Sequence, residues 1–203
     1  MEARDAVTGG HLERVTALGL LLAREVAPRE ARDPQMAFGF MLHDIGKLAV
    51  PDRVLHKPGL LDADEFEIVR RHPEEGARIL ESVPFLARAR EVVLHHHERW
   101  DGDGYPARLR GEAIPLWARI FAVVDALDAM TSDRPYGRRF GLEEAIEEIV
   151  AGSGSQFDPS VVTALVAIDS RAIEELLEPR AGTPVRVARR RWPAAAARVI
   201  SPG

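Results

Sequence analysis

Apolar residues recur at helical spacing through most of the chain, and this periodicity constrains the fold more than any other feature of the sequence. Leu12, Val15, Leu18 and Leu22, for example, mark one face of a helix expected over residues 10–26. Strong alternating strand patterns are absent until VRVAR (185–189), which could form a short strand. The pattern therefore predicts an all-α protein, folded as a compact helical bundle.

Capping and proline signals predict where further helices begin and end. Asp62 followed by Glu65 predicts a capping box that opens a helix extending to about residue 82. Pro84 and Pro115 fit the first turns of the next two helices. The segment between those two helices, RWDGDGYPARLRGEAIP, is dense in Gly, Asp and Pro and predicts a loop. Other helices are expected over residues 35–47 and 141–150, and after the Asp158-Pro159 cap.

Charge is distributed unevenly and divides the chain into two regions. Residues 179–203 contain six arginines and no acid, are rich in Ala and Pro, and are expected to form a flexible tail. Residues 1–178, expected to form one folded domain, then carry 21 basic and 32 acidic residues, a net charge of −11. An acidic body is a poor partner for long nucleic acid. A small phosphate ligand would need cations in its site to supply the missing positive charge.

The chain contains no cysteine, which limits how it could hold a metal. Disulfides, thiolate sites and cysteine nucleophiles are excluded, which leaves the imidazole and carboxylate ligands that suit iron, manganese or zinc. No secretory signal is visible at the N-terminus, and the longest apolar runs (18–23 and 161–168) are too short to span a bilayer. These features favour a cytoplasmic protein without membrane association.

His43 is followed directly by Asp44 at the end of the apolar helix expected over residues 35–47. Burying an imidazole and a carboxylate there is costly unless both are compensated. A cation compensates both, because it binds neutral imidazole and ionised carboxylate. Adjacent helical residues point about 100° apart, so the pair could reach two neighbouring cations, with Asp44 bridging them. The alternative is a helix-end histidine bonded to its neighbouring acid.

Further histidines strengthen the metal hypothesis without deciding it. His96-His97 repeats the adjacent pair just before the Gly- and Asp-rich loop, although three consecutive histidines could also be a solvated run. His72, which precedes a proline, and His11, which follows two glycines, could each be surface residues.

Two acids lie in the apolar segment ARIFAVVDALDAM, where a buried carboxylate needs a partner. These are Asp125 and, three positions on, Asp128, and periodicity alone allows either to be the buried one. The residues by themselves thus predict a multi-histidine metal cluster and leave its reaction open.

Several ordered motifs resemble the HD-GYP branch of the HD metal-dependent phosphohydrolases, whose members fold as a helical bundle of the HD-domain type. The most specific is HHERWDGDGYP (96–106), which contains the Gly-Tyr-Pro for which the branch is named. The others are HDIGK (43–47) with the following VPD and KPG, RRHPEEGARIL, ARIFAVVDALDAMTSDRPY (118–136) and FDP (157–159). The resemblance covers roughly residues 9–168.

The resemblance implies two divalent metal ions, iron or manganese first, with zinc, nickel or magnesium as alternatives. One ion would be held by His11, His43 and Asp125, and the other by His72, His96 and His97. Asp44 would bridge the two ions. The position that supplies a glutamate to a third metal in some members is Val7 here, which favours a two-metal site unless Glu2, Asp5 or Glu13 substitutes. His56 and His95 match no motif position and are interpreted as structural or solvent-facing.

The resemblance also implies which residues meet the substrate. Lys47 and Arg134 would contact its phosphate, and Tyr105 would shape the loop beside it. Asp44 and Lys47 are thus the candidate catalytic residues. Many members continue RPY with a second arginine, whereas this chain has Gly137 there. Neither the motifs nor the spacing chooses the acid that protonates the leaving group, for which Lys47 and a metal-bound water are both candidates.

The implied activity is metal-dependent hydrolysis of cyclic di-GMP to linear pGpG, GMP or both, within bacterial second-messenger signalling. Two metal ions would activate water for in-line attack on phosphorus. A low-turnover module that signals through its cyclic di-GMP-bound state, or another nucleotide phosphohydrolase of the HD superfamily, are the alternatives. A receiver, sensor or GGDEF-type protein is the expected regulatory partner, and a homodimer is the expected assembly.

Overall fold

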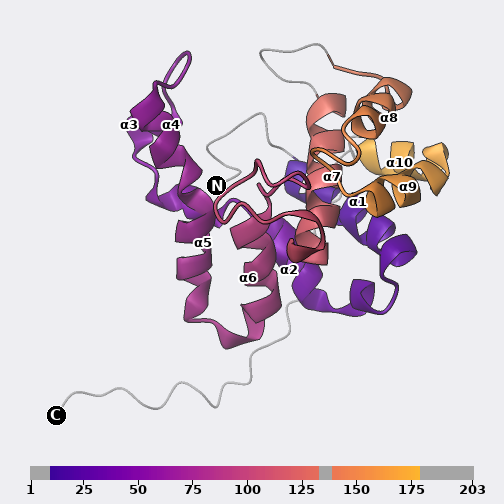
Figure 1. Ribbon diagram of the computed structural model, residues 1–203, viewed down its shortest axis with the longest axis horizontal. Helices are drawn as coiled ribbons and strands as arrows, with labels where there is room; N and C mark the ends of the chain where they lie inside the picture. The colour runs from indigo at the N-terminus through magenta and orange to yellow at the C-terminus, as the bar shows by residue number, and fades with distance from the viewer. Residues whose placement is uncertain (1–9, 133–138, 179–203) are drawn as a thin grey trace, which may run out of the picture.

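The computed structural model describes residues 10–132 and 139–178 and confirms an all-α bundle (Figure 1). Its α-helices are α1 (His11–Val26), α2 (Pro34–Leu42), α3 (Asp52–Leu55), α4 (Ala63–Arg70), α5 (His72–Glu81), α6 (Ala87–His95), α7 (Leu116–Thr131), α8 (Leu142–Ala151), α9 (Pro159–Ala167) and α10 (Ser170–Leu177). Short 3₁₀ segments are η2 (Glu30–Arg32), η3 (Ile45–Ala49), η4 (Pro84–Leu86) and η5 (Gly111–Ala113). No strand occurs in these two ranges, apart from an isolated bridge between Ser153 and Phe157. The VRVAR segment and the arginine-rich tail lie outside the described residues.

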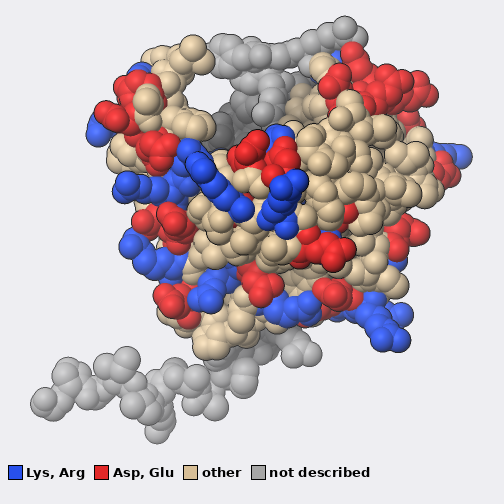
Figure 2. Space-filling view, in the orientation of Figure 1, with Lys and Arg blue, Asp and Glu red and all other residues tan. Residues whose placement is uncertain are grey.

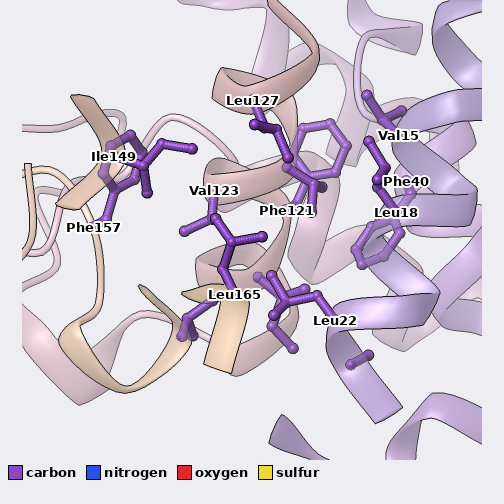
Figure 3. Packing of buried hydrophobic residues seen from close by; sticks show 14 of the residues in the cluster. Val15, Leu18, Leu22, Phe40, Phe121, Val123, Leu127, Ile149, Phe157 and Leu165 are labelled. Atoms are coloured by element: carbon purple, nitrogen blue, oxygen red, sulfur yellow. The ribbon is translucent and has the colours of Figure 1, made fainter. Parts of the chain in front are cut away.

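Helix α7 forms the centre of the bundle. It contacts α1, α6, α8 and α9, and Figure 1 shows it running through the middle of the molecule. A helix with neighbours on several sides must be apolar on several faces, and nine of the sixteen residues of α7 are buried. Phe121, Val123 and Leu127 of α7 pack with Phe40 of α2 and Leu22 of α1 in the main core (Figure 3). The core therefore clamps α1, α2 and α7 together at fixed positions.

A second, smaller core lies between α5 and α6. Leu80, Leu86, Ala89 and Val93 form it, and Leu42 and Ile45 pack against it. The short helices α3 and α4 lie at the left edge of Figure 1, where α4 contacts α5.

Most of the predicted helix boundaries are confirmed. The capping box at the start of α4 is present, because Asp62 accepts from the Glu65 backbone N–H at 2.9 Å and Glu65 accepts from the Asp62 N–H at 3.0 Å. Pro115 precedes α7, and Pro84 opens the 3₁₀ turn that leads into α6. Asp158 caps α9 as predicted.

Two expected helices are shorter than predicted. The helix expected over residues 35–47 ends at Leu42, and the chain then turns into η3. The helix expected from Asp62 to about residue 82 is broken into α4 and α5. Pro73 explains that break, because it has no N–H to bond the carbonyl four residues earlier and its ring collides with that carbonyl.

Charged side chains are interspersed over the face shown in Figure 2, with acidic ones gathered at the upper right over α8. Among the described helices, none is long and apolar enough to cross a membrane.

Gly46 allows η3 to lie directly against the start of α5. A Cβ atom at this position would lie 1.8 Å from the carbonyl oxygen of His72 and 2.5 Å from the backbone nitrogen of Gly76. Real Cβ contacts are never that short, and both neighbours are backbone atoms that cannot move aside independently. The glycine of HDIGK therefore sets the distance between the segment that carries Asp44 and the helix that begins with His72.

We predict that Gly46→Ala destabilises the protein by about 3 kcal/mol or more, because the methyl group must push η3 away from α5. Gly141→Ala is the matched control, since Gly141 has φ −68° and open space around its Cβ position. The free energy of unfolding of this control should fall by no more than about 1 kcal/mol. Urea denaturation of both variants measures the difference, and equal losses would contradict the packing argument.

Candidate metal centre

Three buried histidines follow the ends of three helices and are oriented by carbonyls of those helices. His43 follows α2, His72 follows α4 and His96 follows α6. In each, Nδ1 lies 2.8–2.9 Å from the carbonyl oxygen three residues earlier, on Phe40, Val69 and Val93 respectively. The last carbonyls of a helix lack intrahelical partners, so they accept the Nδ1–H and leave Nε2 as the free nitrogen.

Asp44 lies between these imidazoles and turns one oxygen toward each side. Its Oδ2 is 3.2 Å from Nε2 of His43, and its Oδ1 is 3.3 Å from Nε2 of His72 and 4.0 Å from Nε2 of His96. The nitrogens that face Asp44 are the ones that do not contact the backbone carbonyls. A carboxylate with two oxygens in such a position is suited to bridging two cations.

The potential ligand atoms form two groups, within each of which the atoms lie within 4.8 Å of one another. The first group is His11, His43 and Asp125, and the second group is His72, His96 and His97. These are the two sets that the HD-GYP resemblance implies for separate ions, and Asp44 lies between them. Free Nε2 atoms, carboxylate oxygens and the absence of thiols fit hard or borderline divalent cations. The residues present therefore fit a pair of metal ions.

The ionisation of the centre agrees with metal binding. Burial, with neighbouring imidazoles as the next cause, lowers the pKa of His96 well below 6.5 and that of His97 to about 3. Burial would raise the pKa of Asp44, but hydrogen bonds with His43 and His72 lower it far below its usual value. Neutral imidazoles beside an ionised carboxylate are the protonation states that bind a metal.

The pKa values of Asp125 and His43 are raised, whereas those of the other carboxylate, Asp44, and of the imidazoles of His96 and His97 are lowered. Burial raises the pKa of Asp125, against the pull of His43 and His11. Burial opposes a charge on His43, but its hydrogen bond with Asp44 prevails and raises its pKa. In the first group the carboxylate of Asp125 and the imidazole of His43 therefore both tend to hold a proton, and a bound cation would take the place of that proton.

The structure distinguishes the two acids of α7 that periodicity left open. Asp125 belongs to the first group, with Oδ1 3.7 Å from Nε2 of His11. Asp128 is the more buried of the two, but it points to His11 Nδ1 and Arg14 and belongs to neither group.

The remaining predicted residues surround the centre. Lys47 Nζ lies 2.6 Å from Oδ2 of Asp44, and the ring of Tyr105 stacks on His97 at a centroid distance of 4.7 Å. Arg134 lies outside the described residues, as do Glu2, Asp5 and Val7. His56 is exposed, and His95 is partly buried with Nδ1 3.6 Å from Glu98, so neither belongs to a group.

Glu98 holds the loop beside the centre and was not recognised from the sequence. Its side chain is buried and accepts hydrogen bonds from the backbone N–H groups of Ala107 at 2.7 Å and Leu109 at 3.0 Å. It thereby folds the Gly-Tyr-Pro loop back onto the end of α6. No spacing signal marks this role, because an acid after a histidine pair reads as an ordinary loop residue. Asp101 orders the same loop by accepting from the Asp103 N–H at 3.0 Å.

A cavity of about 500 Å³ opens beside both groups. Its lining includes His96 and His97 of the second group and Asp125 of the first group. Phe66, Arg70 and Tyr105 form another part of the wall. The candidate metal centre is thus accessible to a ligand.

Comparison with known proteins identifies the family of the chain. The family model for the HD domain matches residues 2–161. A cyclic di-GMP phosphodiesterase of Thermotoga maritima is 45% identical over 83% of this chain and 46% of its own length. A 3′3′-cGAMP-specific phosphodiesterase of Vibrio cholerae is 40% identical over 82% of this chain and 32% of its own length. The chain therefore spans less than half the length of these two relatives.

The fold is also found among solved structures. The crystal structure of a cyclic GMP-AMP-specific phosphodiesterase of V. cholerae superposes with a TM-score of 0.62 at 21% identity, covering 82% of this chain and 45% of that one.

The chain belongs to the HD-domain family of proteins. Within that family, its HDIGK and Gly-Tyr-Pro motifs and its relatives place it in the HD-GYP branch.

We predict that His97 makes the metal-free protein sensitive to acid. Its pKa is about 3 in the folded state and about 6.5 when unfolded, so the unfolded chain gains a proton first as the pH falls. The stability associated with neutral His97 is complete above pH 6.5 and is lost toward pH 3, by at most about 1.4 kcal/mol per pH unit.

Urea denaturation of metal-free wild type and His97→Gln from pH 7 to pH 4.5 tests this. The wild type should lose stability more steeply than His97→Gln, whereas the exposed control His56→Gln should follow the wild type. Parallel curves for the wild type and His97→Gln would contradict the prediction.

Proposed function

We propose that this domain hydrolyses cyclic di-GMP, in a metal-dependent reaction, to pGpG, GMP or both. The observation that supports this best is the position of Asp44 between two groups of potential metal ligands beside an open cavity. Relatives named for cyclic dinucleotide hydrolysis, at 40–45% identity, support this substrate class. 3′3′-cGAMP is the second candidate substrate because of the name of the V. cholerae relative.

In this proposal each group would hold one divalent ion, iron or manganese by preference, and Asp44 would serve as a ligand to both. The two ions would supply Lewis acidity and a water nucleophile at neutral pH. The residues of the chain orient this chemistry: backbone carbonyls fix the Nε2 atoms, and depressed pKa values keep His96 and His97 neutral.

Lys47 is proposed to bind the phosphate that is attacked. Its Nζ lies at the edge of the centre, 2.6 Å from Asp44, and a third of the side chain is exposed. A cation on that edge can move from the carboxylate to a phosphoryl oxygen and stabilise the charge that develops there. Arg134 is proposed as a second phosphate contact on the grounds of its motif.

Tyr105 is proposed to contact the substrate through the wall of the cavity. One face of its ring stacks on His97, and the guanidinium of Arg70 lies 4.7 Å from the ring centroid. Burial raises its pKa to about 12, so the hydroxyl stays protonated and can donate a hydrogen bond. Arg70 also lies 5.9 Å from the centroid of Phe66. This row of flat groups leads from the centre into the cavity and is suited to stacking against a purine base.

The test is a substrate panel assayed with protein loaded anaerobically with Mn²⁺ or Fe²⁺. Cyclic di-GMP should be hydrolysed faster than 3′3′-cGAMP, and both much faster than a phosphate monoester. Asp44→Ala should lose both metal content and hydrolysis, and chelation should abolish wild-type activity. The surface variant Asp169→Ala is the control and should retain both.

Other outcomes of this assay would replace the proposal. Full metal content with tight cyclic di-GMP binding but no turnover would favour the signalling module. A preference for the monoester would favour a different HD-family hydrolase. The expected receiver, sensor or GGDEF-type partner, the homodimer and the cytoplasmic location stay predictions.

We predict that Lys47→Ala lowers kcat by about 100-fold, as expected for one phosphate-stabilising group, and leaves the metal content unchanged. Lys57→Ala is the matched control, because Lys57 also pairs with an acid, Glu65 at 2.5 Å, but on α4. Product chromatography and elemental analysis measure the two properties. Loss of metal from Lys47→Ala would show that the lysine is structural instead.

A further inference from the structure

Asp128 is a buried carboxylate that the proposed reaction does not use. It lies in α7 one turn beyond Asp125, and only 1% of its surface is exposed. Such a group is costly to bury unless cations or hydrogen bonds compensate it. Arg14 of α1 does so, with Nε 2.5 Å from Oδ1 and Nη2 3.2 Å from Oδ2. The same Nη2 donates to Oγ of Ser132 at 2.9 Å, which holds the guanidinium in place.

The carboxylate of Asp128 also accepts a hydrogen bond from His11. The distance from Nδ1 of His11 to Oδ2 of Asp128 is 2.8 Å. A histidine that donates Nδ1–H to a carboxylate keeps its proton there, so the lone pair is on Nε2. Nε2 is the atom that faces Asp125 in the first group. Asp128 therefore fixes both the tautomer and the orientation of the His11 ring.

His11 takes its acceptor from another helix. His43, His72 and His96 each come within two residues of the end of a preceding helix, whose last turn supplies a carbonyl to Nδ1, although His72 is also the first residue of α5. His11 is the first residue of α1, and the unpaired backbone groups at a helix N-terminus are N–H donors. Helix α1 offers His11 no such acceptor, and α7 supplies one through Asp128.

We propose that Asp128, braced by Arg14, is a positioning residue that presents Nε2 of His11 to the cation of the first group, and that the second group does not depend on it. This inference rests on the proposed function, because it assumes that the two groups hold cations. It follows the general pattern in which a metal-binding histidine donates its other ring N–H to a carboxylate or carbonyl.

The primary test is Mn²⁺ binding by Asp128→Asn, measured by isothermal titration calorimetry and elemental analysis. The carboxamide conserves the shape, but its single oxygen cannot serve both Arg14 and His11. One Mn²⁺ ion should bind about 10- to 100-fold more weakly, and the other should keep its wild-type Kd. Unchanged affinities, or equal weakening of both ions, would overturn the proposal.

Asp158→Asn is the matched control for loss of a buried carboxylate. Asp158 is 3% exposed and pairs with Arg119 at 2.5 Å, but it caps α9 and touches neither group. This variant should lower the thermal stability and leave both Mn²⁺ affinities unchanged. If Asp158→Asn also weakened the binding of one Mn²⁺ ion, general destabilisation would explain the loss of affinity in Asp128→Asn.

A double-mutant cycle separates positioning from a structural role. In a His11→Ala background, Asp128→Asn should cause no further loss of Mn²⁺ affinity, because the imidazole that it positions is gone. If Asp128→Asn lowered the Mn²⁺ affinity in the His11→Ala background as much as it does in the wild type, the proposal would be contradicted. Arg14→Lys keeps the positive charge but loses the bidentate contact with Asp128. It should weaken binding of the same ion, by less than Asp128→Asn does. This variant provides a test even if Asp128→Asn folds poorly.

Imidazole ¹⁵N NMR of the metal-free protein tests the tautomer directly. At a pH where the ring is neutral, His11 should carry its proton on Nδ1 in the wild type and shift toward the Nε2–H form in Asp128→Asn. An Nε2–H tautomer in the wild type would overturn the inference. The NMR result involves no metal, so it tests the role of Asp128 independently of the proposed function. The proposed function fails if the wild type binds no Mn²⁺.

Discussion

The contact of one carboxylate, Asp44, with the Nε2 atoms of histidines from three separate helix ends is the interaction on which the rest of the structure depends. Each of those imidazoles is buried and donates its Nδ1–H to a carbonyl in the last turn of the preceding helix. The three helix ends must therefore face one point. The main core holds α2 against α1 and α7, and the second core holds α5 against α6, so that this convergence is built into the packing.

Close backbone approach keeps the convergence rigid. Gly46 lets η3 touch the first turn of α5, and Gly104 lets its loop lie against Glu98 and Arg99, where a Cβ atom would be 2.3 Å from the Arg99 nitrogen. Glu98 then anchors the loop through two backbone N–H groups. Neither glycine nor the glutamate is a candidate ligand, yet together they determine where Asp44, His72, His97 and Tyr105 lie.

The histidines of the centre are oriented in two different ways. His43, His72 and His96 are oriented by carbonyls three residues earlier in sequence, so their support forms with the helices themselves. His11 is oriented by an acid 117 positions away, so its support exists only when α1 and α7 have packed. Local backbone and tertiary contacts thus contribute separately to the same centre.

Periodicity, caps and prolines in the sequence were enough to determine the helical class and most helix boundaries, because these signals act through residues close together in the chain. The ordered motifs likewise predicted which seven side chains converge, and the structure brings six of them together in the two predicted groups, with Asp44 between the groups. Their role as ligands stays a prediction. The sequence did not predict that His43 and Asp44 lie beyond the end of α2, or that Pro73 divides α4 from α5. Periodicity could not separate Asp125 from Asp128, and no local signal marked Glu98. Only the tertiary structure decided these points, because the partner that gives a buried charge its role is chosen by packing between helices that are distant in sequence.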